Sequence, residues 1–195
     1  MSSIVQPVAP GTSDDPEVNE LIDQAVKGWW HDSAMMGAIA HQPDLLKTIL
    51  PVFESFFIAG RIPAHLFEMM RLKTGEINRC GYCMTVRAAG VVDQVSPKEE
   101  AFMGEIDESA FTRSEYLGIK LAEYMAGDPN YIPDEFYDEL RKEFTKEEIV
   151  ELIFACSVFN FGNKFNITMR LDTTDESDYE TEMAYPFIPK AAANG

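Results

Sequence analysis

The sequence predicts an all-α protein, and three of its features support this prediction. Apolar residues recur at spacings of three and four through most of the chain, which is the period of a helix with one buried face. Prolines stand at the start of several apolar segments and glycines near their ends, as is typical of helix termini. Segments in which apolar and polar residues alternate, the pattern of a half-buried strand, are absent from the sequence.

The first three expected helices each begin at a proline, because the proline ring fits the first helical turn. The first begins at Pro16 and ends near Gly28, and the second begins at Pro43 and ends before Gly60. The third begins at Pro63, and Gly75 is expected to interrupt it. A fourth helix is expected over 80–90. Each of the four ends at or near a glycine, which favours the end of a helix.

The remaining expected helices have other start signals. Thr112 or Ser114 caps one of them, and Pro133 opens a short one. Thr145 followed by Glu148 matches the Thr-x-x-Glu pattern of a capping box. The apolar residues that follow this box predict a long helix with a buried face.

We expect a single folded domain, since 195 residues fall within the usual range for one domain. The domain is predicted to span 16–171, between an N-terminal arm at 1–15 and a C-terminal tail at 172–195. The arm contains Pro, Gly and Asp without helical periodicity, so we expect it either to be flexible or to wrap around a partner. The tail begins with an acidic run and continues into an aromatic cluster. We expect this cluster to pack on the domain or on another subunit.

The charge of the chain restricts its partners. It carries 16 basic and 33 acidic residues and a net charge of -17, which disfavours nucleic acids and anionic membranes as partners. The sequence contains no apolar run of about 18 residues that could span a membrane, and its first residues lack the pattern of a signal peptide. We therefore expect a cytoplasmic protein, whose cysteines stay reduced unless they cycle during catalysis.

Cys80 and Cys83 form a Cys-x-x-Cys motif. In a helix, residues three apart lie on one face with Cβ atoms about 5–6 Å apart, so the two thiols can close a disulfide. Asn78 is expected to cap this helix, which places both cysteines near its first turn. Free backbone N–H groups and the helix dipole stabilise a thiolate there. The second thiol can then resolve the oxidised product of the first as a disulfide.

Two neighbouring side chains are candidates for the same site. Arg87 follows Cys83 by four residues and is expected one turn further along the same helix face. Its permanent charge can stabilise a thiolate or bind a carboxylate, but it cannot serve as a base. Tyr82 lies between the cysteines, where it either donates a hydrogen bond or packs as an aromatic ring.

Two other interpretations of the motif stay open. The pair could be half of a zinc site, although no second pair of ligands with suitable spacing is apparent. It could also be two buried thiols without chemistry, since free cysteines are often part of the core. We expect redox chemistry with no metal and no cofactor. The remaining cysteine and the histidines are Cys156, which we expect in the core, and His31, His41 and His65.

These residues also resemble a known pattern. Glu68, then Asn78, Cys80, Tyr82 and Cys83, resembles the signature of the carboxymuconolactone decarboxylase / alkylhydroperoxidase D (AhpD) superfamily, in which a Glu precedes a Cys-x-x-Cys and a His follows it by four residues. The segments 41–46, 147–152 and 159–163 resemble further parts of the family pattern, and the likeness covers about 17–171.

The resemblance implies an all-helical fold that assembles as a homotrimer or homohexamer. In the peroxidase members of the family the two cysteines cycle between dithiol and disulfide, and the residues that match Glu68 and the motif His form a proton relay. The decarboxylase members act on a lactone acid and do not depend on a cysteine pair.

The sequence departs from the family pattern at Arg87, which stands where the relay His is expected. Three outcomes follow. Glu68 acts alone as the base while Arg87 holds the thiolate, or His65 replaces the missing His, or Arg87 recognises an anionic substrate.

Our leading hypothesis is a thiol-dependent oxidoreductase with an antioxidant function. Cys80 and Cys83 would reduce a peroxide or a partner disulfide, with Glu68, Arg87 and Tyr82 as the other site residues, and an external dithiol or disulfide reductant would restore the pair. One alternative is a lyase that acts on a small carboxylated ring compound. Another is a non-catalytic binding or assembly protein on the same scaffold.

Overall fold

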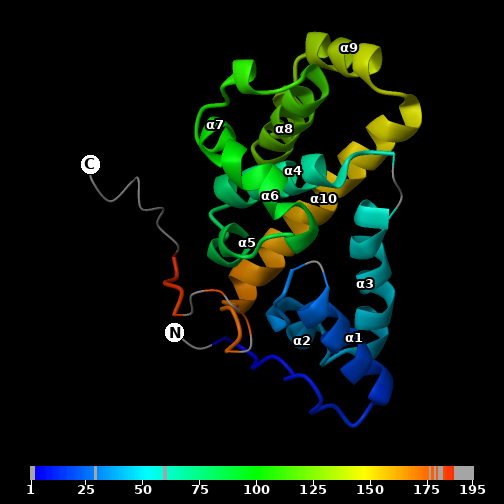
Figure 1. Cartoon of the computed structure of the whole chain (residues 1–195), viewed down its shortest axis with the longest axis vertical. Helices are drawn as coiled ribbons and strands as arrows, with labels where there is room; N and C mark the ends of the chain where they lie inside the picture. The colour runs from blue at the N-terminus through cyan, green and yellow to red at the C-terminus, as the bar shows by residue number, and fades with distance from the viewer. Residues whose placement is uncertain are drawn as a thin grey trace. The chain divides into compact units, whose positions relative to one another are not determined.

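The computed structural model describes residues 3–28, 30–58, 61–175, 177, 179 and 182–186, and all of their side chains except those of residues 57 and 58. The regular elements in these residues are helices, and the described part of the chain contains no strand (Figure 1). The all-α prediction is therefore confirmed. Among the described helices, none combines the length and the apolar composition that crossing a bilayer requires.

The chain divides into two compact units, each built from segments that are distant in sequence. The first unit contains Met1–Ser55, Arg79–Gly90 and Lys164–Gly195, and the second contains Phe56–Asn78 and Val91–Asn163. Two helices, α3 (Pro43–Ile58) and α10 (Lys146–Met169), contribute residues to both units. The first unit thus joins the N-terminal arm, the Cys-x-x-Cys segment and the C-terminal tail.

In the first unit, α1 (Pro16–Lys27) begins at the predicted proline. Asp15 caps it by accepting a hydrogen bond from the backbone N–H of Glu17 at 2.9 Å. The unit also contains α2 (Ala34–Ile39), which contacts α1, and α5 (Gly81–Thr85). The apolar face of α1 follows the helical period, and its buried residues are Val18, Ile22 and Ala25.

The N-terminal arm is attached to the first unit by backbone hydrogen bonds. Ile4 N donates to Met169 O at 3.1 Å, and Val8 N donates to Gly37 O at 3.0 Å. A Cβ atom on Gly37 would lie 2.5 Å from Val8 O, closer than two such atoms can approach. The contact between the arm and α2 therefore requires glycine at position 37.

In the second unit, α4 (Ala64–Ile77) packs along α8 (Arg113–Ala126). The two helices approach closely at Gly118 of α8, where a Cβ atom would lie 2.9 Å from a methyl carbon of Leu66. All the residues 66–75 of α4 are buried, so α4 forms the centre of this unit. Its other helices are α6 (Val92–Val95), α7 (Glu99–Phe102), α9 (Asp134–Glu143) and the first part of α10.

Four short 3-10 helices complete the described elements. Three of them, together with α2, α6 and α7, lie in segments for which no element was predicted. Elements of three to six residues are too short to show a hydrophobic period, which explains why the sequence did not reveal them. The 3-10 helices are Ala89–Val91, Ser96–Lys98, Glu108–Ala110 and Pro129–Tyr131.

Two predicted boundaries are wrong. Helix α4 continues through Gly75 to Ile77, because burial on all sides outweighs the helix propensity that one glycine lacks, about 1 kcal/mol. The helix expected over 80–90 ends at Thr85, and Val86 is extended with a ψ of 138°.

The predicted helix starts near Thr112 and Thr145 are confirmed. Thr112, rather than Ser114, caps α8 and forms a capping box with Glu115. At the start of α10, Thr145 Oγ1 accepts a hydrogen bond from Glu148 N at 3.3 Å, and Glu148 Oε2 accepts one from Thr145 N at 2.8 Å. In both helices the carboxylate satisfies a backbone N–H that would otherwise lack a partner at the helix terminus.

Candidate redox site

Cys80 and Cys83 are joined by a disulfide at the start of α5, with their Cα atoms 5.3 Å apart. Cys80 is the N-cap residue of α5, and its Sγ accepts a hydrogen bond from Cys83 N at 3.3 Å. The prediction that Asn78 caps this helix is wrong, because Asn78 ends α4 and a sulfur takes the capping position. Both cysteines are buried, and 4% of Cys83 is exposed.

The residue before the pair has a strained backbone. Arg79 has a φ of 56°, in the left-handed region that favours glycine. Such a conformation persists only where the surrounding structure holds the chain in place. Cys80 follows it in an extended conformation, with φ of -86° and ψ of 97°, as an N-cap residue requires.

Tyr82 donates a hydrogen bond, which was one of its two expected roles. Its hydroxyl donates to Asp32 Oδ1 at 2.6 Å. Asp32 is buried and also accepts from Ala34 N at 2.9 Å and from Thr174 N at 2.8 Å. The turn between the two cysteines is therefore fixed to the start of α2 and to the C-terminal tail.

Arg87 lies beyond the end of α5, so the expected stacking of Arg87 and Cys83 on one helix face is wrong. Its guanidinium Nη1 donates to the carbonyl oxygens of Met84 at 2.5 Å and of Val86 at 3.3 Å. Its backbone N–H donates a hydrogen bond to the Tyr179 hydroxyl at 3.1 Å, and the same hydroxyl donates one to Arg87 O at 3.2 Å. Arg87 thus stabilises the carbonyl end of α5 and connects it to the tail.

Asn166 is a candidate site residue that was not predicted from the sequence. It lies on α10, is 3% exposed, and its side-chain Nδ2 donates to Cys83 Sγ at 3.4 Å. The local signal was an amide on a mostly apolar helix, where a buried polar group needs a partner. Asp32, Thr174 and Tyr179 gave no comparable signal, because nothing near them in the sequence indicates their contacts.

Glu68, the predicted base, lies in the second unit, whereas Cys80, Cys83, Tyr82 and Arg87 lie in the first. Glu68 is 1% exposed. Its two carboxylate oxygens accept hydrogen bonds from Nε and Nη2 of Arg71, each at 2.7 Å. This bidentate pair fixes the carboxylate geometrically.

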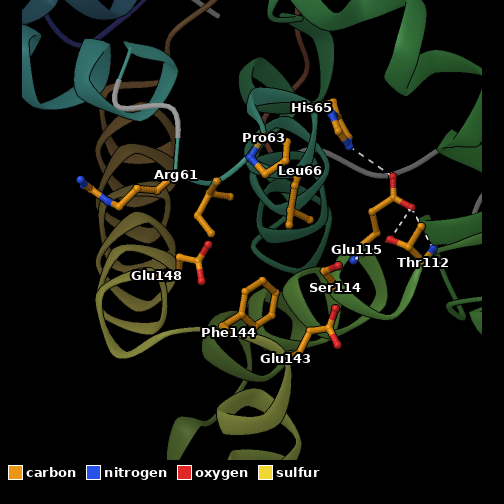
Figure 2. Close-up of a pocket in the computed structure, with 11 residues that line it drawn as sticks. Arg61, Pro63, His65, Leu66, Thr112, Ser114, Glu115, Glu143, Phe144 and Glu148 are labelled. Carbon is orange, nitrogen blue, oxygen red and sulfur yellow. Dashed lines mark hydrogen bonds and ion pairs between the residues drawn. The ribbon is translucent and has the colours of Figure 1, made fainter.

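His65 lies at a pocket of about 360 Å³ in the second unit (Figure 2). Its Nε2 is 3.3 Å from Glu115 Oε1, which also accepts from Lys98 Nζ at 2.6 Å. Burial acts to raise the pKa of Glu115, but hydrogen bonds from Lys98 and Thr112 outweigh it and hold this pKa below its usual value. The structure thus pairs His65 with Glu115, and its use as a relay residue stays a prediction.

The third cysteine lies in the core, as expected. Cys156 is fully buried on α10, and this burial raises the pKa of its thiol far above the usual value. Such a thiol is unreactive at neutral pH. Within the described residues, no three Cys, His, Asp or Glu side chains lie close enough together to hold a metal ion.

No family model matches the chain. Among curated proteins, the chain is similar to the uncharacterized protein YdfG of Bacillus subtilis (strain 168). The two are 21% identical over 107 residues, which cover 52% of this chain and 71% of YdfG.

Several solved structures are similar to almost the whole chain. The apo debrominase Bmp8 is 18% identical with a TM-score of 0.74, and the match covers 90% of this chain and 95% of Bmp8. The AhpD core of a peroxidase-related protein from Ralstonia eutropha JMP134 is 17% identical with a TM-score of 0.67. That match covers 87% of this chain and 92% of the Ralstonia chain. A peroxidase-related protein from Silicibacter sp. TM1040 is 17% identical with a TM-score of 0.66. That match covers 89% of this chain and 97% of the Silicibacter chain. The chain therefore shares the AhpD-like fold of these solved structures.

Proposed function

We propose that this chain is a thiol-dependent oxidoreductase in which Cys80 and Cys83 cycle between dithiol and disulfide. The observation that carries the proposal is the disulfide at the start of α5 in a chain with an AhpD-like fold. Solved structures with this fold include proteins described as peroxidase-related. A hydroperoxide is therefore the first substrate class to consider.

In the proposed cycle, the thiolate of one cysteine attacks an oxygen of the hydroperoxide. An S–O bond forms, the O–O bond breaks, and the alcohol leaves. The resulting sulfenic acid condenses with the second thiol, which forms the disulfide and releases water. An external dithiol then supplies two electrons and two protons to restore the reduced pair. The net products are an alcohol, water and an oxidised dithiol, and no bound cofactor takes part.

Two hydrogen-bond donors support the chemistry of the pair. Cys83 N lies 3.3 Å from Cys80 Sγ, and Asn166 Nδ2 lies 3.4 Å from Cys83 Sγ. An N–H group directed at a sulfur favours the anionic form, so the thiol loses its proton more readily. That Glu68 acts as the base stays a prediction from the family resemblance. Tyr82 and Arg87 hold the cysteine segment in place.

A second candidate function is thiol-dependent dehalogenation, which the likeness to Bmp8 favours. Its TM-score of 0.74 exceeds those of the two peroxidase-related proteins. A variant of Bmp8 with a cysteine replaced by alanine has been solved in complex with 2,3,4-tribromopyrrole. For this chain, the reaction would replace a carbon–bromine bond of a small ring by a carbon–hydrogen bond. The dithiol would become a disulfide, and bromide and a proton would leave.

The test compares the reduced full-length chain with the variants Cys80→Ser and Cys83→Ser. Hydrogen peroxide, tert-butyl hydroperoxide and tribromopyrrole are supplied in turn, with dithiothreitol as the external dithiol. We expect turnover of one substrate class by the wild type, disulfide formation detected by mass, and loss of turnover to background in both variants. Cys156→Ala serves as the control and should retain turnover, because that thiol is buried in the core.

Two other results contradict the proposal. If both cysteine variants retain turnover, the reaction does not use the pair, and small carboxylated ring compounds become the substrates to test for lyase activity. If the wild-type pair stays reduced with every oxidant and no substrate is consumed, a binding or assembly role on the same scaffold is supported instead.

A further inference from the structure

The side-chain amide of Asn166 contacts the cysteine pair from α10. Its Nδ2 lies 3.4 Å from Cys83 Sγ, between two residues that are 83 positions apart in sequence. Asn166 is 3% exposed and Cys83 is 4% exposed, so water competes little for this contact. A donor in such surroundings acts more strongly on a charged sulfur than it would in solvent.

The carbonyl oxygen of the same amide lies in an unusual environment. Asn166 Oδ1 is buried and has no hydrogen-bond partner in the described part of the chain. A buried carbonyl oxygen without a donor costs free energy, and a native structure that keeps one needs an explanation. The structure shows the oxidised pair, in which neither sulfur carries a proton.

Reduction supplies the missing donor. A protonated thiol is a weak hydrogen-bond donor, whereas a thiolate and a disulfide sulfur only accept. The carboxamide of Asn166 has both a donor and an acceptor. It can therefore present Oδ1 to an S–H group and Nδ2 to a thiolate at one position.

The neighbouring asparagine on α10 shows the contrast. Asn163 is also buried, at 2% exposure, but its Oδ1 accepts a hydrogen bond from Asn78 Nδ2 at 3.0 Å. Asn163 thus has a structural partner in the second unit. Asn166 Nδ2 instead contacts Cys83 Sγ, and Asn166 Oδ1 accepts no hydrogen bond from the oxidised pair.

We propose that Asn166 is a positioning residue for the thiol pair, and that its amide stabilises the Cys83 thiolate through Nδ2. The proposal rests on the proposed redox function and names the group that makes Cys83 acidic where Arg87 replaces the expected His. In this proposal Asn166 Oδ1 accepts a hydrogen bond from the protonated Cys83 thiol, and Asn166 Nδ2 donates one to the Cys83 thiolate.

The first experiment measures alkylation of Cys83 against pH in the reduced full-length protein, with iodoacetamide as the probe and mass analysis of each cysteine. Asn166→Leu keeps the branched shape of the side chain and removes both polar atoms. Asn166→Asp keeps the volume, removes the donor and adds a negative charge. We expect about tenfold less Cys83 thiolate at neutral pH in Asn166→Leu, because the charged sulfur loses one hydrogen bond. The loss should be larger in Asn166→Asp.

The control is Asn163→Leu, which should lower thermal stability through the lost bond to Asn78 and leave the pH profile of Cys83 unchanged. Asn166→Leu should change the pH profile of Cys83 without lowering thermal stability, since it removes a buried oxygen that has no hydrogen-bond partner. A folded Asn166→Leu variant with the wild-type pH profile overturns the proposal.

A second measurement needs no variant. In the ¹⁵N-labelled wild-type protein, the side-chain amide signals of Asn166 should shift at the pH at which Cys83 titrates, and again when the pair is oxidised. Signals that stay fixed through both changes overturn the proposal. Failure of the redox function is distinguishable from these results. An enzyme without turnover can still show Cys83 acidity that depends on Asn166, and an active enzyme can show acidity that does not.

Discussion

Asp32 connects three segments of the first unit through one buried carboxylate. Its oxygens accept from the Tyr82 hydroxyl at 2.6 Å, from Ala34 N at 2.9 Å and from Thr174 N at 2.8 Å. A buried carboxylate is tolerated only when such donors replace the water that it has lost. The turn between Cys80 and Cys83 is therefore held by a residue 50 positions before Tyr82.

At this residue scale we expect Tyr82→Phe to lower the free energy of unfolding by about 1.5–3 kcal/mol, because a buried carboxylate loses a hydrogen bond. Urea unfolding at neutral pH measures the change. Tyr131→Phe is the control, since Tyr131 is 79% exposed, and it should change stability by less than about 0.5 kcal/mol. Equal unfolding midpoints for Tyr82→Phe and the wild type would contradict the role of Asp32.

The candidate site residues that could be predicted from the sequence are those with a local pattern. Cys80 and Cys83 are recognisable from their spacing alone, and Tyr82 from its place between them. Arg87 was also predicted from its spacing, but the helix expected to align it with Cys83 ends at Thr85. Its partner Tyr179 is 92 positions away, and no local pattern indicates a contact of that kind.

At the scale of the elements, the start of α8 is held by Glu115. Its carboxylate closes a capping box with Thr112 and accepts from Lys98 at 2.6 Å, with His65 at 3.3 Å. A negative charge at a helix N-terminus is also favoured by the helix dipole. One carboxylate therefore connects α8 to α4 and to the segment before α7.

The lowered pKa of Glu115 predicts a pH dependence of stability. Because the folded-state pKa lies below the unfolded value of 4.5, the ionised group stabilises the fold above that pH. The contribution is lost as the pH falls through the lowered folded-state pKa. We expect Glu115→Gln to be less stable than the wild type at pH 7, with the difference shrinking toward pH 3 in urea unfolding.

Glu147→Gln is a suitable control for this prediction, because the side chain of Glu147 is 59% exposed on α10. It should leave stability unchanged at both pH values. A difference between wild type and Glu115→Gln that stays constant from pH 7 to pH 3 would show that the charge of Glu115 contributes nothing.

The helices themselves were mostly predictable from the sequence. Thr112 and Thr145 start α8 and α10 as their side chains indicate, because a capping residue acts within its own turn. Gly75 was misjudged, since propensity describes an isolated helix and α4 is buried among its neighbours. The division into two units was not predicted, because it depends on which distant segments come together.

At the scale of the whole molecule, the net charge of -17 opposes association between copies of the chain. The resemblance to the family nevertheless implies a homotrimer or homohexamer. If apolar contacts hold such an oligomer, salt should strengthen it by screening the repulsion between subunits.

We therefore expect light scattering to give three or six times the chain mass of 21.9 kDa. The fraction of oligomer should rise as the ionic strength increases from about 0.05 M to about 0.5 M, where the screening length falls well below 10 Å. A mass of one chain across this range would contradict the expectation. A fraction that falls with salt would indicate that ion pairs hold the subunits together.

The first unit also has a consequence for the order in which the site is made. Asn166 follows Cys83 by 83 residues, and Thr174 comes later still. A ribosome that adds roughly 5–20 residues per second exposes the cysteine pair several seconds before the amide and the tail that complete its surroundings. During translation, Cys80 and Cys83 are therefore ordinary thiols of an unfinished chain, and they acquire their special environment only when almost all of this sequence has been synthesised.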